Sequence, residues 1–402
     1  MFSLERFINE KVTGRQTSMF CPDIAANRDT LSRKISGKSI LVIGGAGSIG
    51  SSFIKAVLPF KPDSLTVADI NENALAELTR DLRSTKDMYI PDNFITYPMD
   101  FASSVFKKMF VSSGGFDIVA NFSAHKHVRS EKDVFSVEAL IRNNVLNAGL
   151  LLDLLEQYPP EEYFCVSTDK AANPVNIMGA SKRIMEDLIF AYSDKFPVKT
   201  ARFANVAFSN GSLPAGFLAR IQKLQPLGAP TDTKRYFVSP EESGQICMLS
   251  CMLGNNREIF FPKLKEAQML TFDKIAVDLL HEYGYEVLEC SSDEEAIERS
   301  AALKQGGRQY PVHFSASDTS GEKAFEEFYT DSETVDIERL SALGVITGKQ
   351  IPDKERLRRL LDSLTAAFEK TNAAKEEIVE IIKDYLPDFE HIEKGRSLDS
   401  KM

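Results

Sequence analysis

The sequence KSILVIGGAGSIG, residues 38–50, joins an apolar strand to a glycine-rich turn and the start of a helix. Its apolar part has no polar interruption, as expected for a strand of a parallel sheet that is covered on both faces. Three glycines at GxxGxxG spacing would let the backbone approach a pyrophosphate, and the N-terminus of the following helix would attract its charge. They are Gly44, Gly47 and Gly50. The stretch therefore predicts a dinucleotide-binding turn.

An acidic residue supports this interpretation. A second predicted strand, SLTVAD, ends at Asp69, about 20 residues after Gly50, where such folds place the acid that binds the adenosine ribose. No arginine follows it in ADINEN to neutralise a 2′-phosphate. The predicted cofactor is therefore NAD rather than NADP.

Strands and helices alternate through the next hundred residues. The segments FITYPMD, FDIVANFSA, EYFCVST and VKTARFANV are predicted strands, and helices are expected over 71–84, over 136–158 and from Met178 onward. This alternation predicts an α/β fold with a doubly wound parallel sheet. After Val206 the sequence becomes rich in Gly and Pro, and a smaller part is expected to begin there.

These shifts in pattern divide the chain into four predicted parts. They are an N-terminal helical extension (1–36), a dinucleotide-binding domain (37–205, with 238–265 returning to it), a substrate-binding part (206–237 and 266–330) and a helical C-terminal tail (331–402). The tail carries apolar residues at helical spacing. We expect it to serve stability or assembly and to be dispensable for the chemistry.

Composition limits the choice of partners. The 402 residues carry a net charge of −10 and no Lys/Arg block, which disfavours nucleic acid or an anionic membrane as a partner. The five cysteines are scattered, so buried thiols are expected, and no metal site is predicted. No stretch resembles a signal peptide or approaches the length of a membrane span. We expect a cytoplasmic protein.

A second stretch, VSTDKAANPVNIMGASKR (166–183), carries the candidate chemistry. Thr168, Asp169 and Lys170 follow a predicted strand, at the carboxyl edge where open α/β sheets bind ligands. Met178 and Lys182 are four residues apart and share one face of the next helix. An acid, a hydroxyl and two ammonium groups are thus expected around one crevice.

Together these motifs resemble the extended short-chain dehydrogenase/reductase superfamily. Within it, the chain resembles the UDP-N-acetylglucosamine 4,6-dehydratases, a family of polysaccharide biosynthesis proteins, in its soluble short form. The resemblance covers roughly 37–330 and rests on GGAGSIG, AHKHV, STDKAANPVNIMGASKR, RFANV with SNGSLP, TKRYFVSPEE and SGEKAFEEF. It implies a Rossmann-type fold, NAD as cofactor, a UDP-sugar substrate and a homo-oligomer.

The resemblance also implies roles for individual residues. Asp169 is the expected acid, Lys170 the base at sugar C5, Thr168 the group that binds the C4 oxygen, and Lys182 a contact of the nicotinamide ribose. The implied cofactor-binding residues are Gly44, Gly47, Ser48, Ile49, Gly50, Asp69, Asp100, Phe101, Ser123, Ala124, Lys126, Asn144 and Lys182. The implied substrate-binding residues are His125, His127, Asn205, Ser212, Arg235, Glu322 and Lys323.

Two positions depart from the family pattern. Met178 occupies the place of the superfamily's tyrosine, four residues before Lys182, so the proton acceptor for the sugar C4 hydroxyl is open. SDTSGEK lacks the arginine that precedes the GEK motif in relatives. A 4-epimerase and a non-catalytic NAD-binding protein are the alternatives. The paired Asp169 and Lys170 argue against the epimerase, because an epimerase needs no acid at C6. The intact group Thr168, Asp169 and Lys170 weighs against a non-catalytic protein.

Overall fold

The centre of the molecule is a nine-stranded sheet. The computed structural model describes residues 2–127, 131–317, 325 and 327–392. The strand order is β15-β16-β11-β6-β5-β4-β1-β2-β3, and the seven strands from β11 to β3 run parallel. The strands are β1 (Ser39–Ile43), β2 (Ser64–Asp69), β3 (Asn93–Pro98), β4 (Ile118–Asn121), β5 (Glu162–Val166), β6 (Val198–Ala201), β11 (Glu258–Pro262), β15 (Thr334–Asp336) and β16 (Leu343–Thr347).

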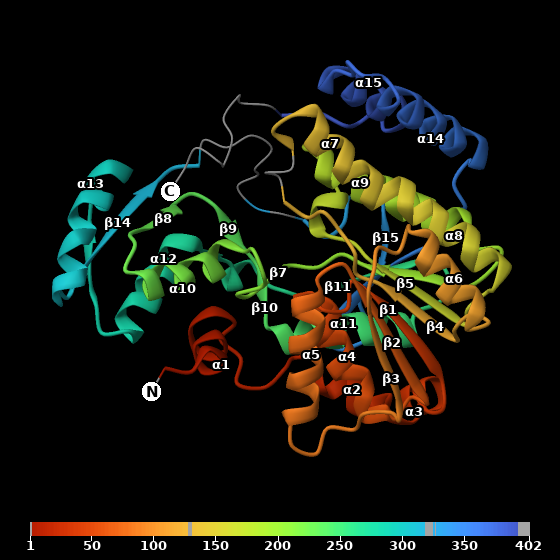
Figure 1. Ribbon diagram of the computed structural model, residues 1–402, viewed down its shortest axis with the longest axis horizontal. Helices are drawn as coiled ribbons and strands as arrows, with labels where there is room; N and C mark the ends of the chain where they lie inside the picture. Colours follow the sequence, from red (N-terminus) through yellow and green to blue (C-terminus); the bar gives the residue numbers. More distant parts are fainter. Residues whose placement is uncertain (1, 128–130, 318–324, 326, 393–402) are drawn as a thin grey trace.

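Helices pack against both faces of this sheet, which confirms the predicted doubly wound α/β fold (Figure 1). One group contains α6 (Ser104–Ser112), α7 (Val134–Ile141), α8 (Asn147–Gln157) and α9 (Ile177–Ala191), and the other contains α4 (Ser48–Val57), α5 (Glu72–Ser84) and α11 (Pro240–Leu253). α11 lies very close to α4, since a β-carbon added to Gly244 would be 2.1 Å from the Ser52 carbonyl oxygen. Apolar side chains from both groups and from the strands form one large core.

A smaller lobe lies beside the large one (Figure 1). It contains a parallel three-stranded sheet in the order β13-β14-β8 and has its own apolar core. Its elements are β8 (Leu227–Pro230), β13 (Glu286–Glu289), β14 (Gln309–Ser315), α10 (Leu213–Lys223), α12 (Phe272–Glu282) and α13 (Asp293–Arg299). The predicted substrate-binding part supplies all of these elements.

The N-terminal extension connects the two cores. Phe7 in α1 (Leu4–Phe7) packs in the core of the small lobe, whereas Leu31 in α3 (Arg28–Ile35) packs in that of the large lobe. The carboxylate of Asp23, in α2 (Cys21–Ala26), accepts hydrogen bonds from the backbone amides of Ser341 and Ala342 at 2.6 and 2.8 Å. The N-terminal extension is therefore fixed to the residues that immediately precede β16.

The C-terminal segment differs from the predicted helical tail. Residues 334–347 contain β15 and β16, which extend the sheet: β16 pairs antiparallel with β11, and β15 pairs antiparallel with β16. β16 has the sequence LGVIT, and its Leu343, Val345 and Ile346 are fully buried in the core. This burial favours a strand over a helix at these residues. Helices follow only at α14 (Lys354–Phe368) and α15 (Lys375–Tyr385), which lie over α7 and α9 (Figure 1).

Candidate active site

The glycine-rich turn after β1 leaves no room for side chains. Gly44 has a φ of +70°, and a β-carbon there would lie 2.6 Å from the Ser123 amide nitrogen. A β-carbon on Gly50 would lie 2.4 Å from the Gly44 carbonyl oxygen. Gly47 begins α4 as its N-cap and supplies no side-chain cap. A close-packed turn that leads into a helix N-terminus fits the pyrophosphate of a dinucleotide.

Neighbouring elements fix the surroundings of this turn. One carboxylate oxygen of Asp69 accepts a hydrogen bond from the Ala46 amide at 3.1 Å, and the other accepts one from the Asn71 amide at 2.9 Å. The Ser48 hydroxyl accepts a hydrogen bond from the Asn210 amide at 2.8 Å, which joins the turn to the SNGSLP loop. Asp69 is therefore oriented beside the glycine turn, as the ribose-binding role requires.

The acid, hydroxyl and amine after β5 converge on one oxygen atom. Asp169 Oδ1 accepts hydrogen bonds from Thr168 Oγ1 at 2.7 Å, from the Lys170 amide at 2.9 Å and from Lys170 Nζ at 3.2 Å. Asp169 is 4% exposed, so these contacts replace water around its carboxylate. The predicted catalytic residues thus form a compact group that can donate and accept protons.

Helix α9 packs directly against this loop. A β-carbon on Gly179 would lie 2.7 Å from the Lys170 carbonyl oxygen. Lys182 Nζ donates to the Val166 carbonyl oxygen at 3.0 Å, and burial lowers the pKa of Lys182. Met178 is buried in the large core, and its amide donates to Glu131 Oε1 at 2.9 Å. Its position in the core suits a packing residue.

Asn144 joins the loop after β4 to α9. Its side chain accepts a hydrogen bond from the His125 amide at 2.8 Å and donates to the His125 carbonyl at 2.9 Å and to Ser181 Oγ at 3.0 Å. Asn144 lies in a π-helical turn, η4 (Arg142–Leu146), that interrupts the helix expected over 136–158. Such turns change which side chains face inward.

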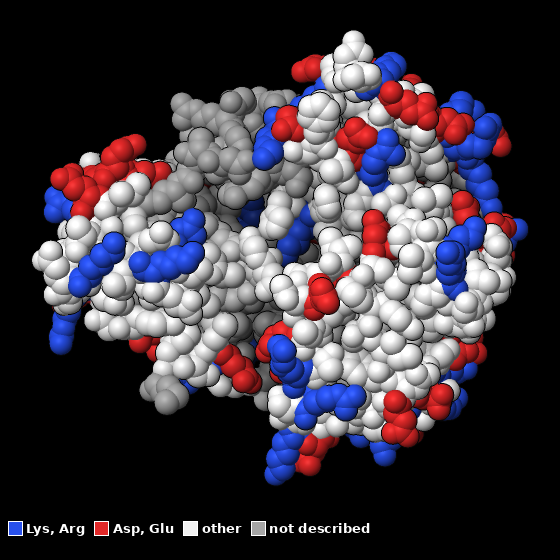
Figure 2. Space-filling view, viewed as in Figure 1, with Lys and Arg blue, Asp and Glu red and all other residues white. Residues whose placement is uncertain are grey.

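The loop after β4 carries three further predicted residues: His125, Lys126 and His127. Partial desolvation lowers the pKa of His125 and Lys126, although both side chains keep contact with solvent. A β-carbon on Gly211 would lie 3.0 Å from His127 Nε2, so His127 reaches the SNGSLP loop. Figure 2 shows a hollow with basic side chains between the two lobes.

Several predicted binding residues have clear structural positions of their own. Ser212 caps α10, Arg235 is 5% exposed, and the Asn205 amide bonds to the Tyr236 carbonyl oxygen at 3.1 Å. Asp100 accepts a hydrogen bond from the Ala102 amide at 2.9 Å, and Phe101 is 7% exposed. Ser123 lies against Gly44, and Ala124 and Ile49 are half-buried. Glu322 and Lys323 lie outside the described residues.

Sequence reasoning missed a buried set of polar side chains behind the loop. Ser167 Oγ donates to Glu186 Oε1 at 2.7 Å, and Arg202 bonds to the same carboxylate. Glu186 follows Lys182 by four residues on α9, so helical spacing offered one signal for it. Glu131, which holds the Met178 amide, had no local signal because its partner is 47 residues away.

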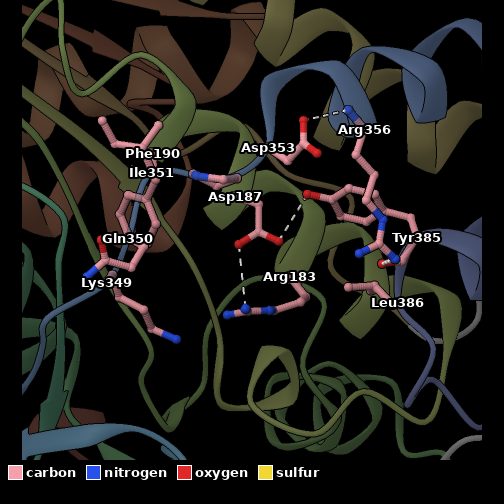
Figure 3. Close-up of a pocket in the computed structure, with 11 residues that line it drawn as sticks. Arg183, Asp187, Phe190, Lys349, Gln350, Ile351, Asp353, Arg356, Tyr385 and Leu386 are labelled. Carbon is pink, nitrogen blue, oxygen red and sulfur yellow. Dashed lines mark hydrogen bonds and ion pairs between the residues drawn. The ribbon is translucent and has the colours of Figure 1, made fainter.

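A pocket of about 380 Å³ lies between α9 and the C-terminal segment (Figure 3). Asp187 lies at its centre, 3.5 Å from the Arg183 guanidinium and 3.3 Å from the Tyr385 hydroxyl. Lys349 and Arg356 come from the C-terminal segment. The pocket contains none of the predicted site residues. We therefore place the candidate active site at the hydrogen-bonded group formed by Thr168, Asp169 and Lys170 and not at this pocket.

Two other kinds of site are absent from the part of the chain that the structure describes. No cluster of three or more His, Cys, Asp or Glu side chains could hold a metal ion. No helix in the same residues combines the length and the apolar character that crossing a bilayer requires.

Comparison with known proteins supports the motifs. The family model for polysaccharide biosynthesis protein matches residues 40–343. An uncharacterized membrane protein of Methanocaldococcus jannaschii is 30% identical over 86% of this chain and 96% of its own length. A UDP-N-acetylglucosamine 4,6-dehydratase (inverting) of Campylobacter jejuni is 25% identical over 74% of this chain and 84% of its own length. The chain spans only 57% and 49% of two further curated relatives.

A solved structure supports the fold. The dTDP-glucose 4,6-dehydratase DesIV of Streptomyces venezuelae, solved with NAD and TYD bound, superimposes with a TM-score of 0.56. It is 18% identical, and the match covers 80% of this chain and 95% of that one. The resemblance to the extended short-chain dehydrogenase/reductase superfamily is confirmed, and the chain belongs to the polysaccharide biosynthesis protein family.

Proposed function

We propose that this protein is an NAD-dependent nucleotide-sugar 4,6-dehydratase that converts UDP-N-acetylglucosamine to a UDP-4-keto-6-deoxy sugar. The observation that carries the proposal is the group formed by Thr168, Asp169 and Lys170, in which an acid and an amine share a 3.2 Å contact. Elimination of water needs both a proton donor and a base within reach of one sugar. The name of the Campylobacter relative agrees with this reaction.

The cofactor part of the proposal rests on the glycine-rich turn. Gly44 and Gly50 leave space for a pyrophosphate, and Asp69 can accept hydrogen bonds from ribose hydroxyls while repelling a 2′-phosphate. When bound, NAD would accept hydride from sugar C4 and return it to C6. Lys182, held at the end of β5, is suited to the nicotinamide ribose.

Asp169 and Lys170 have complementary proton roles in elimination. Lys170 acts as a neutral amine that takes the proton at C5, which the 4-ketone makes acidic, and gives that proton back to C5 when hydride reaches C6. Asp169 gives a proton to the C6 oxygen, so that the oxygen leaves as water. Its low exposure keeps bulk water from competing for that proton.

The contact between Thr168 and Asp169 offers a route for the C4 proton. Met178 has no titratable group, so it cannot accept that proton. Thr168 Oγ1 donates to Asp169 Oδ1 at 2.7 Å and can accept from the sugar C4 hydroxyl at the same time. A proton that passes from the C4 oxygen through Thr168 would convert Asp169 from carboxylate to acid. That same proton then leaves with the C6 oxygen.

Product analysis tests the proposal. The purified protein is incubated with UDP-N-acetylglucosamine, and the product is examined by mass spectrometry and NMR. Loss of one water with a new methyl signal at C6 is the expected result. An isomer of unchanged mass would show a 4-epimerase instead. Absence of turnover and of bound NAD reduction across a panel of nucleotide sugars would show a non-catalytic protein.

A further inference from the structure

The carboxyl end of β6 holds a fully buried guanidinium, that of Arg202. Its Nε and Nη2 donate to the two carboxylate oxygens of Glu186 at 2.8 and 2.7 Å. Nη1 and Nη2 donate to Glu333 at 2.8 and 3.1 Å, and Nη1 also donates to the Phe328 carbonyl at 3.1 Å. These contacts use all five N–H donors of the side chain.

Cations surround both carboxylates of this cluster. Besides Arg202, Lys349 Nζ lies 2.5 Å from Glu333 Oε1, and Arg183 Nη1 lies 3.3 Å from Glu186 Oε2. Burial opposes the ionisation of Glu333, but Arg202 and Lys349 outweigh it and lower its pKa to about 2. Burial also opposes the ionisation of Glu186, and Arg202 again lowers the pKa. Both acids are therefore charged at neutral pH.

This cluster reaches the catalytic loop through one hydroxyl. Ser167 Oγ donates to Glu186 Oε1 at 2.7 Å, and Ser167 is the residue immediately before Thr168. Glu186 lies one helical turn after Lys182 on α9. An uninterrupted set of charged and hydrogen-bonded contacts thus joins the C-terminal segment to Ser167, the residue before the catalytic loop.

We propose that Glu333 is a positioning residue for the catalytic loop, because it fixes Arg202 and, through Glu186, the backbone at Ser167. A buried ion pair is a poor source of stability compared with apolar packing, so its presence here calls for another role. Holding Thr168 and Asp169 in register is such a role. The inference rests on the proposed use of that loop in catalysis but not on the identity of the sugar.

The test replaces Glu333 by an uncharged residue of the same size. Glu333→Gln leaves Arg202 partly unpaired, and a displacement of about 1 Å at a reacting group can cost roughly 100-fold in rate. We expect kcat to fall about 10- to 100-fold, with the KM for the sugar and the content of bound NAD nearly unchanged. Glu333→Asp, which restores the charge, should recover most of the lost rate.

Glu258→Gln is the matched control. Glu258 lies at the amino end of β11, the sheet edge opposite the catalytic loop, and accepts hydrogen bonds from Arg339 at 3.0 and 2.7 Å. This variant breaks an ion pair whose glutamate is buried and whose arginine is partly exposed, so it should lower thermal stability and leave kcat unchanged. If Glu333→Gln lowers stability as the control does and keeps the wild-type kcat, the role of Glu333 is structural and the proposal fails.

Two further measurements keep the test decisive. Ser167→Ala and Glu333→Gln should be non-additive in kcat if they act through the same contacts, and additive losses would contradict the proposal. Amide hydrogen exchange over 167–170 should accelerate in Glu333→Gln and not in Glu258→Gln. Because exchange needs no substrate, it decides the positioning role even if UDP-N-acetylglucosamine is not turned over, and unchanged exchange would overturn the proposal.

Discussion

The glycine-rich turn and the C-terminal segment support the same site by opposite means. Gly44 and Gly50 are needed because they carry no side chain where the backbone of neighbouring strands comes closest. Glu333 matters because its long charged side chain reaches the Arg202 guanidinium, and Lys349 matters because its ammonium pairs with Glu333. The turn is therefore sensitive to added atoms, whereas the segment is sensitive to lost charge. The following predictions test this difference, from the largest effect to the smallest.

Removing the C-terminal segment should have the largest effect. A chain that ends at residue 330 loses β16, the partner of β11, and leaves Arg202 without Glu333. Breaking one side of a buried ion pair costs about 3–5 kcal/mol, so we expect no folded protein. The sequence predicts a tail that serves stability or assembly and is dispensable for the chemistry, and this expectation agrees with the first part of that prediction.

A chain with a smaller part of its C-terminal segment removed is the control for this experiment. A chain that ends at residue 350 keeps Glu333, Lys349 and both edge strands, and loses α14 and α15. It should fold and bind NAD, as circular dichroism and cofactor release would show. Folded, active protein from the shorter chain would contradict the supporting role of the segment.

The group that both regions support should show the next largest effect. Asp169→Asn removes the proposed acid, and such groups contribute roughly 100- to 10,000-fold to rate. The variant should lose most turnover and reduce little bound NAD, because Asp169 also receives the C4 proton in the proposed route. The absorbance of the reduced nicotinamide measures this. Met178→Ala should cost stability through lost packing but less of the rate. Near-normal turnover in Asp169→Asn would remove the site assignment.

Low pH should lower the contribution of the Glu333 ion pairs to stability more than that of the glycine-rich turn. Because the folded pKa of Glu333 is lowered from 4.5 to about 2, its contribution is complete above pH 4.5 and is lost as pH falls toward 2. The shift corresponds to on the order of 3 kcal/mol of unfolding free energy. Denaturant titrations between pH 5 and 2 should show a shallower loss in Glu333→Gln than in wild type. Parallel pH curves would contradict the charge-based account.

Added atoms in the glycine turn should have the smallest of these effects on stability. A β-carbon at Gly50 would meet the Gly44 carbonyl oxygen at 2.4 Å, so Gly50→Ala should cost about 1–3 kcal/mol and lower NAD content. At Gly47 the same contact would be 3.3 Å, so Gly47→Ala should cost much less. Thermal unfolding and released NAD measure both variants. Equal losses in the two would show that side-chain space is not what the turn requires.

Local patterns predicted the strands β1 to β6 and the grouping of the candidate catalytic residues, but neither β15 nor β16. The signals for Gly44, Gly50 and Asp69 lie within one strand–turn–helix unit, and Thr168–Lys170 are consecutive. Sequence separation hid the rest. Glu333 meets Arg202 across 131 positions, and the backbone carbonyl of Glu131 meets Lys375 across 244. Local periodicity does not predict such pairs, because the two residues come together only when the edge of the sheet forms.

The same limit explains two errors of detail. β16 is only five residues long and is followed by amphipathic helices, so the sequence pattern predicted helix where the structure has this strand. The π-helical turn around Asn144 looks like ordinary helix in sequence, since one extra residue does not disturb the apolar pattern. Both features depend on tertiary contacts that override local preference.

The contact of Asp23 with Ser341 and Ala342 has a consequence for synthesis on the ribosome. The two partners are separated by 318 positions, so at about 5–20 residues per second the first waits roughly 16–60 s for the second to be made. During that interval α2 lacks the amides that satisfy its buried carboxylate, and β11 lacks the strand that covers its edge. The large lobe can therefore close only after residues 341–347 have been made, and its unpaired edge must be protected from aggregation until then.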